Sequence, residues 1–306
     1  MNRNYLDTAR LLMQVAPFVF ADGLFALKGG TAINLFVRDM PRLSVDIDLV
    51  FTDHTLSRTD ALEGISKSIK TSAEHLPQRG FQPHIAGTAD GDTKLMVRRD
   101  SIEIKVEVNY VMRGTVYPVR MASLMPAARE ILSAELEIPV VSLEDVYGSK
   151  LVAALDRQHP RDLFDVMQLF AHEGLTPGIR RAFAVYLACH NRPVHEVLNP
   201  SLRDIRLDYE RNFNGMTTEP IPLTALLETR ERMVAELQHG MTSDERSFLI
   251  SLVSNRPEWN LLGLDHLETL PALQWKHQNL KKLQDENQIK FEEQAEILIS
   301  LLAEEH

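Results

Sequence analysis

Two aspartates separated by one residue stand in a stretch of alternating apolar and polar side chains, and this alternation constrains the fold most strongly. The apolar members are Leu43, Val45, Ile47 and Leu49, and the polar members between them are Ser44, Asp46 and Asp48. Successive side chains of a strand point to opposite faces, so the pattern predicts a half-buried strand with both carboxylates on its polar face. Neighbouring carboxylates repel one another unless a cation lies between them, and hard oxygen ligands favour Mg²⁺. The stretch therefore predicts a magnesium site that the phosphates of a nucleoside triphosphate could complete.

A glycine turn precedes these aspartates. Residues 25–27 are typical of a short strand and residues 32–36 of the first turns of a helix, so Gly29, Gly30 and Thr31 are expected to connect them. Glycines let backbone N–H groups approach an anion closely, and a threonine hydroxyl can cap the helix or donate to a phosphate. Taken alone, the glycine pair is more often an ordinary turn, and an Asp-x-Asp pair is more often a solvated strand face. The two motifs in this order predict a phosphoryl-transfer site.

A second alternating stretch, residues 101–109, offers a third carboxylate. Glu103 and Glu107 both lie on its polar face together with Lys105. If this strand lies beside the aspartate strand, one glutamate could complete the metal site and act as general base for an attacking hydroxyl. The same residues are equally compatible with an ordinary ladder of charges between strands.

Charged residues farther along the chain fall on two predicted helices. Residues 143–155 form an apolar stripe, with Lys150 beside it and Asp145, Ser149 and Gln158 on the open polar arc. A helical lysine is usually a solvated surface charge. The next helix starts at Pro160, so Asp162 is a candidate capping acid. Arg157 and Arg161 either neutralise phosphate charge or pair with Asp156 and Asp165.

These motifs, taken in order, resemble those of the AbiEii/AbiGii nucleotidyltransferase toxin family, which belongs to the DNA polymerase β-like nucleotidyltransferase superfamily. The resemblance rests on five segments, and it extends over most of the chain to segments 256–264 and 270–276, whose role is unassigned. The five segments are Gly29-Gly30-Thr31, Asp46-x-Asp48, Lys105–Val108, Asp145–Lys150 and Arg161–Asp165. The chain departs from the usual Gly-Ser of the phosphate turn by carrying Gly30-Thr31, which keeps the hydroxyl.

The resemblance implies a metal-dependent nucleotidyltransferase of a toxin–antitoxin or phage-defence system, which transfers nucleotides from an NTP to the 3′ end of tRNA and inhibits translation. The implied metal is Mg²⁺, or Mn²⁺ in its place, held by Asp46, Asp48 and Glu107. The implied catalytic residues are these three acids with Lys150 and Asp165. The predicted nucleotide-binding set is Lys28, Gly29, Gly30, Thr31, Ser44, Lys150, Arg161 and Asp162. A cognate antitoxin is expected as a partner, although direct binding to it is not implied.

Composition sets the background for this hypothesis. The chain has 306 residues, 44% of them hydrophobic, and it shows neither a signal-peptide pattern nor a membrane-length apolar segment, so a cytoplasmic protein is expected. Its one cysteine, Cys189, is predicted to be a small buried apolar residue, and its scattered histidines predict no zinc site.

The net charge of −10 argues against RNA as the acceptor. Basic residues could still line one face, while acidic residues gather in the tail at Glu292, Glu293, Glu296, Glu304 and Glu305. The candidate basic residues are Arg98, Arg99, Arg113, Arg120, Arg157, Arg161, Arg180, Arg181 and residues 276–282.

The expected architecture is α+β. Residues 1–140 form a polymerase β-like nucleotidyltransferase core with a mixed sheet, and residues 141–306 form a helical lobe that completes the NTP site and binds the acceptor. Residues 191–215 are expected to be a long irregular segment, and the tail from Gln284 a single charged helix that packs through an apolar stripe. Two alternatives remain open: nucleotidyl transfer to a protein or a small molecule, and a catalytically silent nucleotide-binding regulator.

Overall fold

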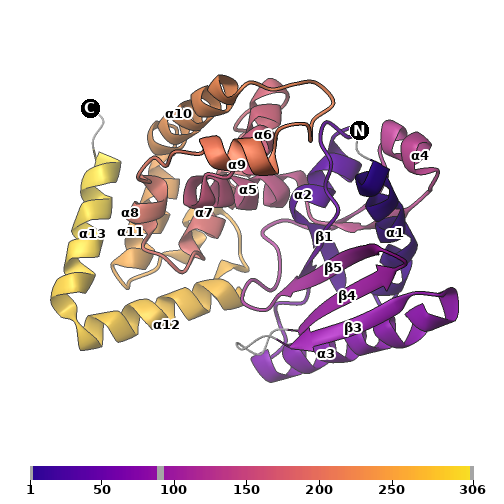
Figure 1. Ribbon diagram of the computed structural model, residues 1–306. Helices are drawn as coiled ribbons and strands as arrows, with labels where there is room; N and C mark the ends of the chain where they lie inside the picture. Colours follow the sequence, from indigo (N-terminus) through magenta and orange to yellow (C-terminus); the bar gives the residue numbers. More distant parts are fainter. Residues whose placement is uncertain (1–2, 88–92, 304–306) are drawn as a thin grey trace. The chain divides into compact units, whose positions relative to one another are not determined.

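The computed structural model describes residues 3–87 and 93–303, and the chain divides into two compact units (Figure 1). Unit 1 comprises Met1–Ser142 and Gly215–Pro220, and unit 2 comprises Leu143–Asn214 and Ile221–His306. The return of residues 215–220 to unit 1 was not predicted. There Thr217 forms an isolated bridge with Arg42, and the Leu43 N–H donates to the Met216 carbonyl at 3.3 Å. The division of function between residues 1–140 and 141–306 stays a prediction.

Unit 1 is built on one mixed sheet of seven strands in the order β3-β4-β5-β2-β1-β7-β6. Strand β2 pairs antiparallel with β1 and parallel with β5, so the two central contacts of the sheet differ in direction. This mixed sheet, followed by a largely helical second unit, confirms the predicted α+β class. The strands are β1 (Phe25–Lys28), β2 (Ile47–Phe51), β3 (Gln82–Gly87), β4 (Thr93–Arg99), β5 (Ile102–Asn109), β6 (Arg120–Ser123) and β7 (Glu137–Val140).

Two long helices of unit 1 pack on one face of this sheet. Helix α1 (Arg3–Val19) contacts β5, helix α3 (Arg58–His75) contacts β3 and β4, and the two helices touch each other. Buried side chains of β5, including Ile104 and Val106, alternate with the half-buried polar ones, as the sequence predicted. The polar set therefore lies on the face opposite the two helices. The shorter helices of this unit are α2 (Gly29–Ala32), η1 (Ile33–Val37), η2 (Leu76–Arg79) and α4 (Pro126–Leu132).

The aspartate strand is shorter than its alternation predicted. Strand β2 begins only at Ile47, and residues 43–46 form an irregular segment ahead of it. Asp48 therefore lies on a strand, whereas Asp46 lies just before one. The physical reason is that residues 42 and 43 pair with the returning segment 215–220, which draws the chain away from the sheet.

Unit 2 is helical. Helix α5 packs closely on α7, and Gly148 makes this possible, because a Cβ there would lie 2.7 Å from the Ala182 Cβ. The helices are α5 (Leu143–Arg157), α6 (Pro160–Ala171), α7 (Pro177–Ala188), α8 (Val194–Leu198), α9 (Arg206–Asn212), α10 (Leu223–His239), α11 (Ser243–Val253), η3 (Trp259–Leu262), η4 (Leu267–Thr269), α12 (Pro271–Glu286) and α13 (Gln288–Ala303). Figure 1 shows α12 and α13 as two separate helices that meet at an angle.

Three predictions for unit 2 were wrong in detail. The expected irregular segment 191–215 contains α8 and α9, and the single tail helix is two helices that break at Asn287. Phe291, Ala295, Leu298 and Leu302 of the predicted stripe are buried, but Ile297 is half-exposed at 50%. Short apolar runs and a charged helix give too weak a periodic signal to define such boundaries. Glu304 and Glu305 of the acidic tail lie outside the described residues.

The role of segments 256–264 and 270–276 is partly structural. Trp259 packs against Phe248 and His277, with ring centroids 6.5 and 6.2 Å away, whereas Trp275 is 41% exposed. In the part of the chain that the structure describes, the helices lack the length and apolarity that crossing a membrane requires.

Candidate active site

A row of four charged residues crosses the polar face of the sheet in unit 1, opposite α1 and α3. Strand register pairs Lys28 with Asp48, Asp48 with Glu107, and Glu107 with Lys94. Paired residues of neighbouring strands point to the same face, so these side chains form a continuous row with two carboxylates between two ammonium groups. The β5 strand thus lies beside the aspartate strand, as the sequence analysis required for a third acid.

Of the two candidate glutamates, Glu107 is the one beside Asp48. Glu103 pairs instead with Arg98 at 3.0 Å on the neighbouring strand. Glu107 forms ion pairs with Lys94 and, at 2.7 Å, with Lys105. Burial opposes its ionisation, but these two lysines outweigh burial and hold the pKa of Glu107 below its usual value. Both readings of the sequence therefore apply to Glu107, which lies beside Asp48 and also belongs to a ladder of charges.

Lys105 connects this ladder to both aspartates. Its hydrogen bond to Glu107 raises its pKa despite burial, and the charges of Glu107, Asp46 and Asp48 raise it further. A protonated Lys105 therefore partly balances the clustered carboxylates. Within residues 3–87 and 93–303, no three carboxylate, imidazole or thiol groups converge as a ready-made metal site.

The glycines are required by close approach of the acidic segment. The helix begins directly at Gly29, with Lys28 at its N-cap, so the predicted three-residue turn is the first turn of α2. Gly29 has a φ of +75°, and a Cβ there would lie 2.5 Å from the Asp48 Oδ2. A Cβ on Gly30 would lie 2.8 Å from both the Arg42 Nη2 and the Ser44 Oγ. The absence of a side chain at positions 29 and 30 therefore lets Asp48 and Ser44 lie close to the backbone, in addition to the expected role of glycine in the turn.

Thr31 ties the helix start to the aspartate segment. Its hydroxyl donates to the Asp46 carbonyl at 2.6 Å and lies 3.1 Å from the Ser44 Oγ. The residue is 1% exposed, so this hydroxyl fixes the backbone at Asp46 from inside the unit. Five of the predicted positions, 29, 30, 31, 46 and 48, are therefore brought together in unit 1, and Ser44 joins them.

The predicted residues of unit 2 form a separate cluster between α5 and α6. Lys150 is 7% exposed, which contradicts its reading as a solvated surface charge. Its ammonium group lies 2.8 Å from the Asp162 Oδ1 and 3.1 Å from the Asp165 Oδ2. Asp165 is fully buried, and Asp162 also pairs with Arg157 at 2.9 Å. Two cations thus balance two carboxylates, which is the condition for burying charges.

The arginines near this cluster have other partners than the two aspartates considered in the sequence analysis. Arg157 binds Asp162 and Asp156 binds Arg192 at 2.6 Å, so these two ion pairs differ from the alternative that pairs Arg157 and Arg161 with Asp156 and Asp165. Arg161 is half-buried at the start of α6, where its N–H donates to the His159 Nδ1 at 3.1 Å. His159, and not Asp162, therefore caps this helix.

Two polar residues predicted to be open on α5 and just after it are buried. Asp145 accepts a hydrogen bond from the Tyr186 hydroxyl at 2.7 Å, and Gln158 donates to the Ser201 carbonyl at 2.8 Å. Helical periodicity missed them because their partners are distant in the chain, on α7 for Asp145 and in the segment between α8 and α9 for Gln158. Lys94 and Arg42 were also missed, and no local signal could have found them, since their positions depend on strand pairing.

Several residues of the predicted basic face are used in internal contacts. Arg113 is buried, Arg98 pairs with Glu103, and Arg180 pairs with Glu245 at 2.9 Å. Lys276 is also buried.

Cys189 is half-buried rather than fully buried, and burial raises the pKa of its thiol to about 12, so it stays protonated.

Comparison with known proteins gives two findings. The structure is similar to that of MenT4, a nucleotidyltransferase toxin from Mycobacterium tuberculosis H37Rv, with a TM-score of 0.59 and 18% sequence identity over 91% of this chain and 95% of that one. At this identity the likeness concerns the fold. No curated protein matches the sequence.

The family comparison covers most of the chain. A family model described as the nucleotidyl transferase AbiEii toxin of type IV toxin–antitoxin systems matches residues 10–279. The matched range contains both charged clusters described above. The chain therefore belongs to the AbiEii nucleotidyltransferase toxin family, and it is a nucleotidyltransferase of a type IV toxin–antitoxin system.

Proposed function

We propose that this toxin transfers nucleotides from an NTP to the 3′ end of tRNA in a reaction that requires Mg²⁺ or Mn²⁺ and releases pyrophosphate. The product would be blocked at its acceptor end, which would inhibit translation and could serve phage defence. The observation that carries the proposal is the contact of Asp48 with Gly29 beside the fixed segment at Asp46. This arrangement supports a site in which two carboxylates are held next to the start of a helix.

The donor set in unit 1 fits Mg²⁺. This ion is commonly held by one or two carboxylates and completes its shell with water and substrate phosphates. Asp46 and Asp48 would hold it, with Glu107 next to Asp48 as the third acid. When bound, the ion supplies charge stabilisation for the transferring phosphoryl group and its attacking and leaving oxygens. The glycines leave room for the carboxylates and for close approach of a phosphate.

Glu107 has a lowered pKa and is therefore ionised at neutral pH. A carboxylate of low pKa is a weak general base, since proton acceptance is most effective near the operating pH. Its stronger contribution is to hold the ammonium groups of Lys94 and Lys105 on the face that carries Asp48. There they would offset the charge of an approaching triphosphate.

In unit 2, the assignment of Lys150 to the triphosphate and of Asp165 to catalysis comes from the family resemblance. The buried ion pairs of Lys150 with Asp162 and Asp165 support a well-oriented ammonium group. Arg161 and Asp162 would assist at the same helix start. The cognate antitoxin of the system is a functional partner, and type IV membership alone does not require that it touch this chain.

The test is nucleotide labelling with a matched pair of variants. Wild type, Asp48→Asn and Asp53→Asn are incubated with each α-labelled NTP, Mg²⁺ and total cellular RNA. RNA, protein and small-molecule fractions are then counted separately. We expect label in tRNA with wild type and a loss of roughly 10²-fold or more with Asp48→Asn, because a carboxylate at the reacting phosphate is removed. Asp53 lies just beyond the same strand and accepts hydrogen bonds from the neighbouring Thr55 and Leu56, away from Gly29 and Asp48, so its variant should remain active.

Two controls sharpen the outcome. Periodate oxidation of the terminal ribose destroys the 3′ hydroxyl, so it should abolish labelling of tRNA. Label confined to protein or small molecules would reject tRNA as the acceptor. Full activity of Asp48→Asn would reject the site itself.

A further inference from the structure

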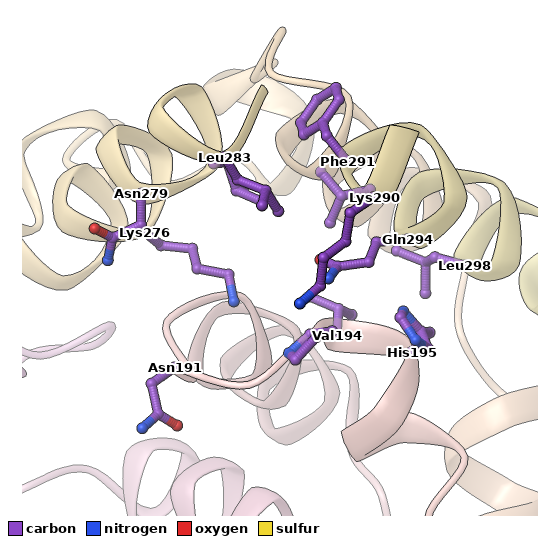
Figure 2. Close-up of a pocket in the computed structure, with 13 residues that line it drawn as sticks. Asn191, Val194, His195, Lys276, Asn279, Leu283, Lys290, Phe291, Gln294 and Leu298 are labelled. Carbon is purple, nitrogen blue, oxygen red and sulfur yellow. The ribbon is translucent and has the colours of Figure 1, made fainter. Parts of the chain in front are cut away.

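A cavity in unit 2 lies apart from both charged clusters. Its volume is about 240 Å³, and it is lined by the segment leading into α8, by α8 itself, by the end of α11 and by the facing sides of α12 and α13. Most of its wall is apolar, formed by Val194, Val253, Leu280, Leu283, Phe291 and Leu298. Figure 2 shows the side chains of α12 and α13 reaching into this space from two directions.

Two lysines give this cavity its charge. Lys276 reaches into it from α12 and Lys290 from α13, and both extend toward the segment before α8 (Figure 2). Among its described lining residues none is acidic, so the lining carries two positive charges in a chain whose net charge is −10. Such a local excess of positive charge in an acidic protein favours an anion at this place.

Of the two lysines, Lys276 gives the stronger indication that the cavity binds an anion. It is 5% exposed, and its ammonium group donates to the carbonyl oxygens of His190 at 2.7 Å and Arg192 at 2.8 Å. Within the described part of the chain these are its hydrogen-bond acceptors, and neither carries a full negative charge. Burial lowers the pKa of Lys276 to about 8, although the charge of Glu196 opposes this shift, so the group is still largely charged at neutral pH. An ammonium group has three N–H donors, so a bound anion could accept the remaining one.

We propose that this cavity binds a small amphipathic organic anion, with its carboxylate on Lys276 and Lys290 and its apolar body against Leu283 and Phe291. An apolar cavity of about 150 Å³ holds a benzene molecule, so this cavity has room for a ligand of roughly ten heavy atoms. Apolar walls with a few converging polar groups are the usual make-up of a small-molecule site. Asn191, Asn279 and Gln294 supply further hydrogen-bonding groups.

This site lies only partly within the range that the family model matches, which includes α8 and Lys276. The family match ends at residue 279, whereas Leu283, Lys290, Phe291 and Leu298 all follow it. The ligand would join α8, α12 and α13, so its binding should also stabilise the C-terminal helix α13.

The experiment is calorimetric titration of the full chain with octanoate at neutral pH and physiological salt. We expect one site per chain with a Kd for octanoate below about 1 mM. The uncharged isostere octanamide should have a Kd at least about tenfold higher. Lys290→Glu, an exposed position that should not disturb folding, should weaken octanoate binding about tenfold. Lys281→Glu makes the same charge change on the exposed part of α12 outside the lining, and it should bind as wild type.

A further variant separates this proposal from the proposed transferase site. Asp48→Asn alters unit 1 only, so it should keep full octanoate affinity even though nucleotide transfer is lost. Loss of octanoate binding in that variant would place the ligand in the nucleotide site and overturn the proposal. It would also be overturned by absence of binding at about 1 mM, by equal affinity for octanamide, or by equal effects of the two lysine variants.

Discussion

Asp48 lies so close to Gly29 that a side chain at position 29 would collide with its carboxylate. The strand carries Asp48 toward the start of α2, and the space that a Cβ would take at Gly29 is occupied by the Asp48 carboxylate. Gly29 also has a positive φ, which costs a residue with a Cβ about 1 kcal/mol. Two separate physical demands therefore act on one residue, and they can be tested apart.

Gly29→Ala should reduce nucleotide transfer about 10²-fold, because the new methyl group displaces Asp48 and small displacements of reacting groups have effects of this size. Gly80→Ala is the matched control, since Gly80 has a φ of +79° but open space around its Cβ position. The positive φ should cost both variants about 1 kcal/mol of unfolding free energy, with a further loss in Gly29→Ala from the collision with Asp48, and only Gly29→Ala should lose activity. Equal activities in labelling assays would show that the contact with Asp48 has no functional role.

At the level of elements, α5 and α6 are joined by a buried cluster of charges. Lys150 on α5 faces Asp162 and Asp165 on α6, and both aspartates are at least nine-tenths buried. Removal of one partner leaves an uncompensated charge in a dry environment, which is far more costly than loss of a surface pair.

Lys150→Met should therefore lower the unfolding free energy by about 3 kcal/mol or more in urea titrations. The double variant Lys150→Met/Asp165→Asn should recover part of this loss, since Arg157 still pairs with Asp162. Lys282→Met, which breaks an exposed pair with Glu286 at 3.8 Å, should change stability by less than about 0.5 kcal/mol. If the double variant were less stable than the single one, charge imbalance would not explain the loss.

For the whole molecule, the acidic balance of the chain conceals local positive sites. The 33 basic residues are outnumbered by 43 acidic ones, yet Lys94 and Lys105 face the carboxylates of unit 1, and Lys276 is buried in unit 2. Ionisation of such a buried group links the stability of the fold to pH.

Lys276 should make stability rise with pH. Burial lowers its pKa in the folded state to about 8, against an ordinary value of 10.5, although Cys189 and Glu196 oppose the shift. Between these values the unfolded chain binds a proton that the folded chain does not, so the unfolding free energy increases with pH, by at most about 1.4 kcal/mol per unit. Comparison with Lys276→Met by chemical unfolding from pH 7 to 10.5 cancels the other groups. Parallel curves for the two proteins would contradict the shift.

Local patterns in the sequence predicted a set of candidate site residues and the type of element near each of them, because such patterns report local structure. The alternation predicted the strand that carries Asp48, although Asp46 lies just ahead of it, and the helical stripe predicted the helix that carries Lys150. The order of these motifs also led to the family, and the family match confirmed it.

Tertiary structure alone decided how those residues are paired. Strand register places Glu107, and not Glu103, beside Asp48, and it brings Lys94 to Glu107 from a strand with no motif of its own. Helix packing buries Lys150, Asp145 and Gln158, which a helical pattern treats as exposed. The physical reason is that burial and ion pairing depend on partners distant in the chain, whereas periodicity reports only the face of one element.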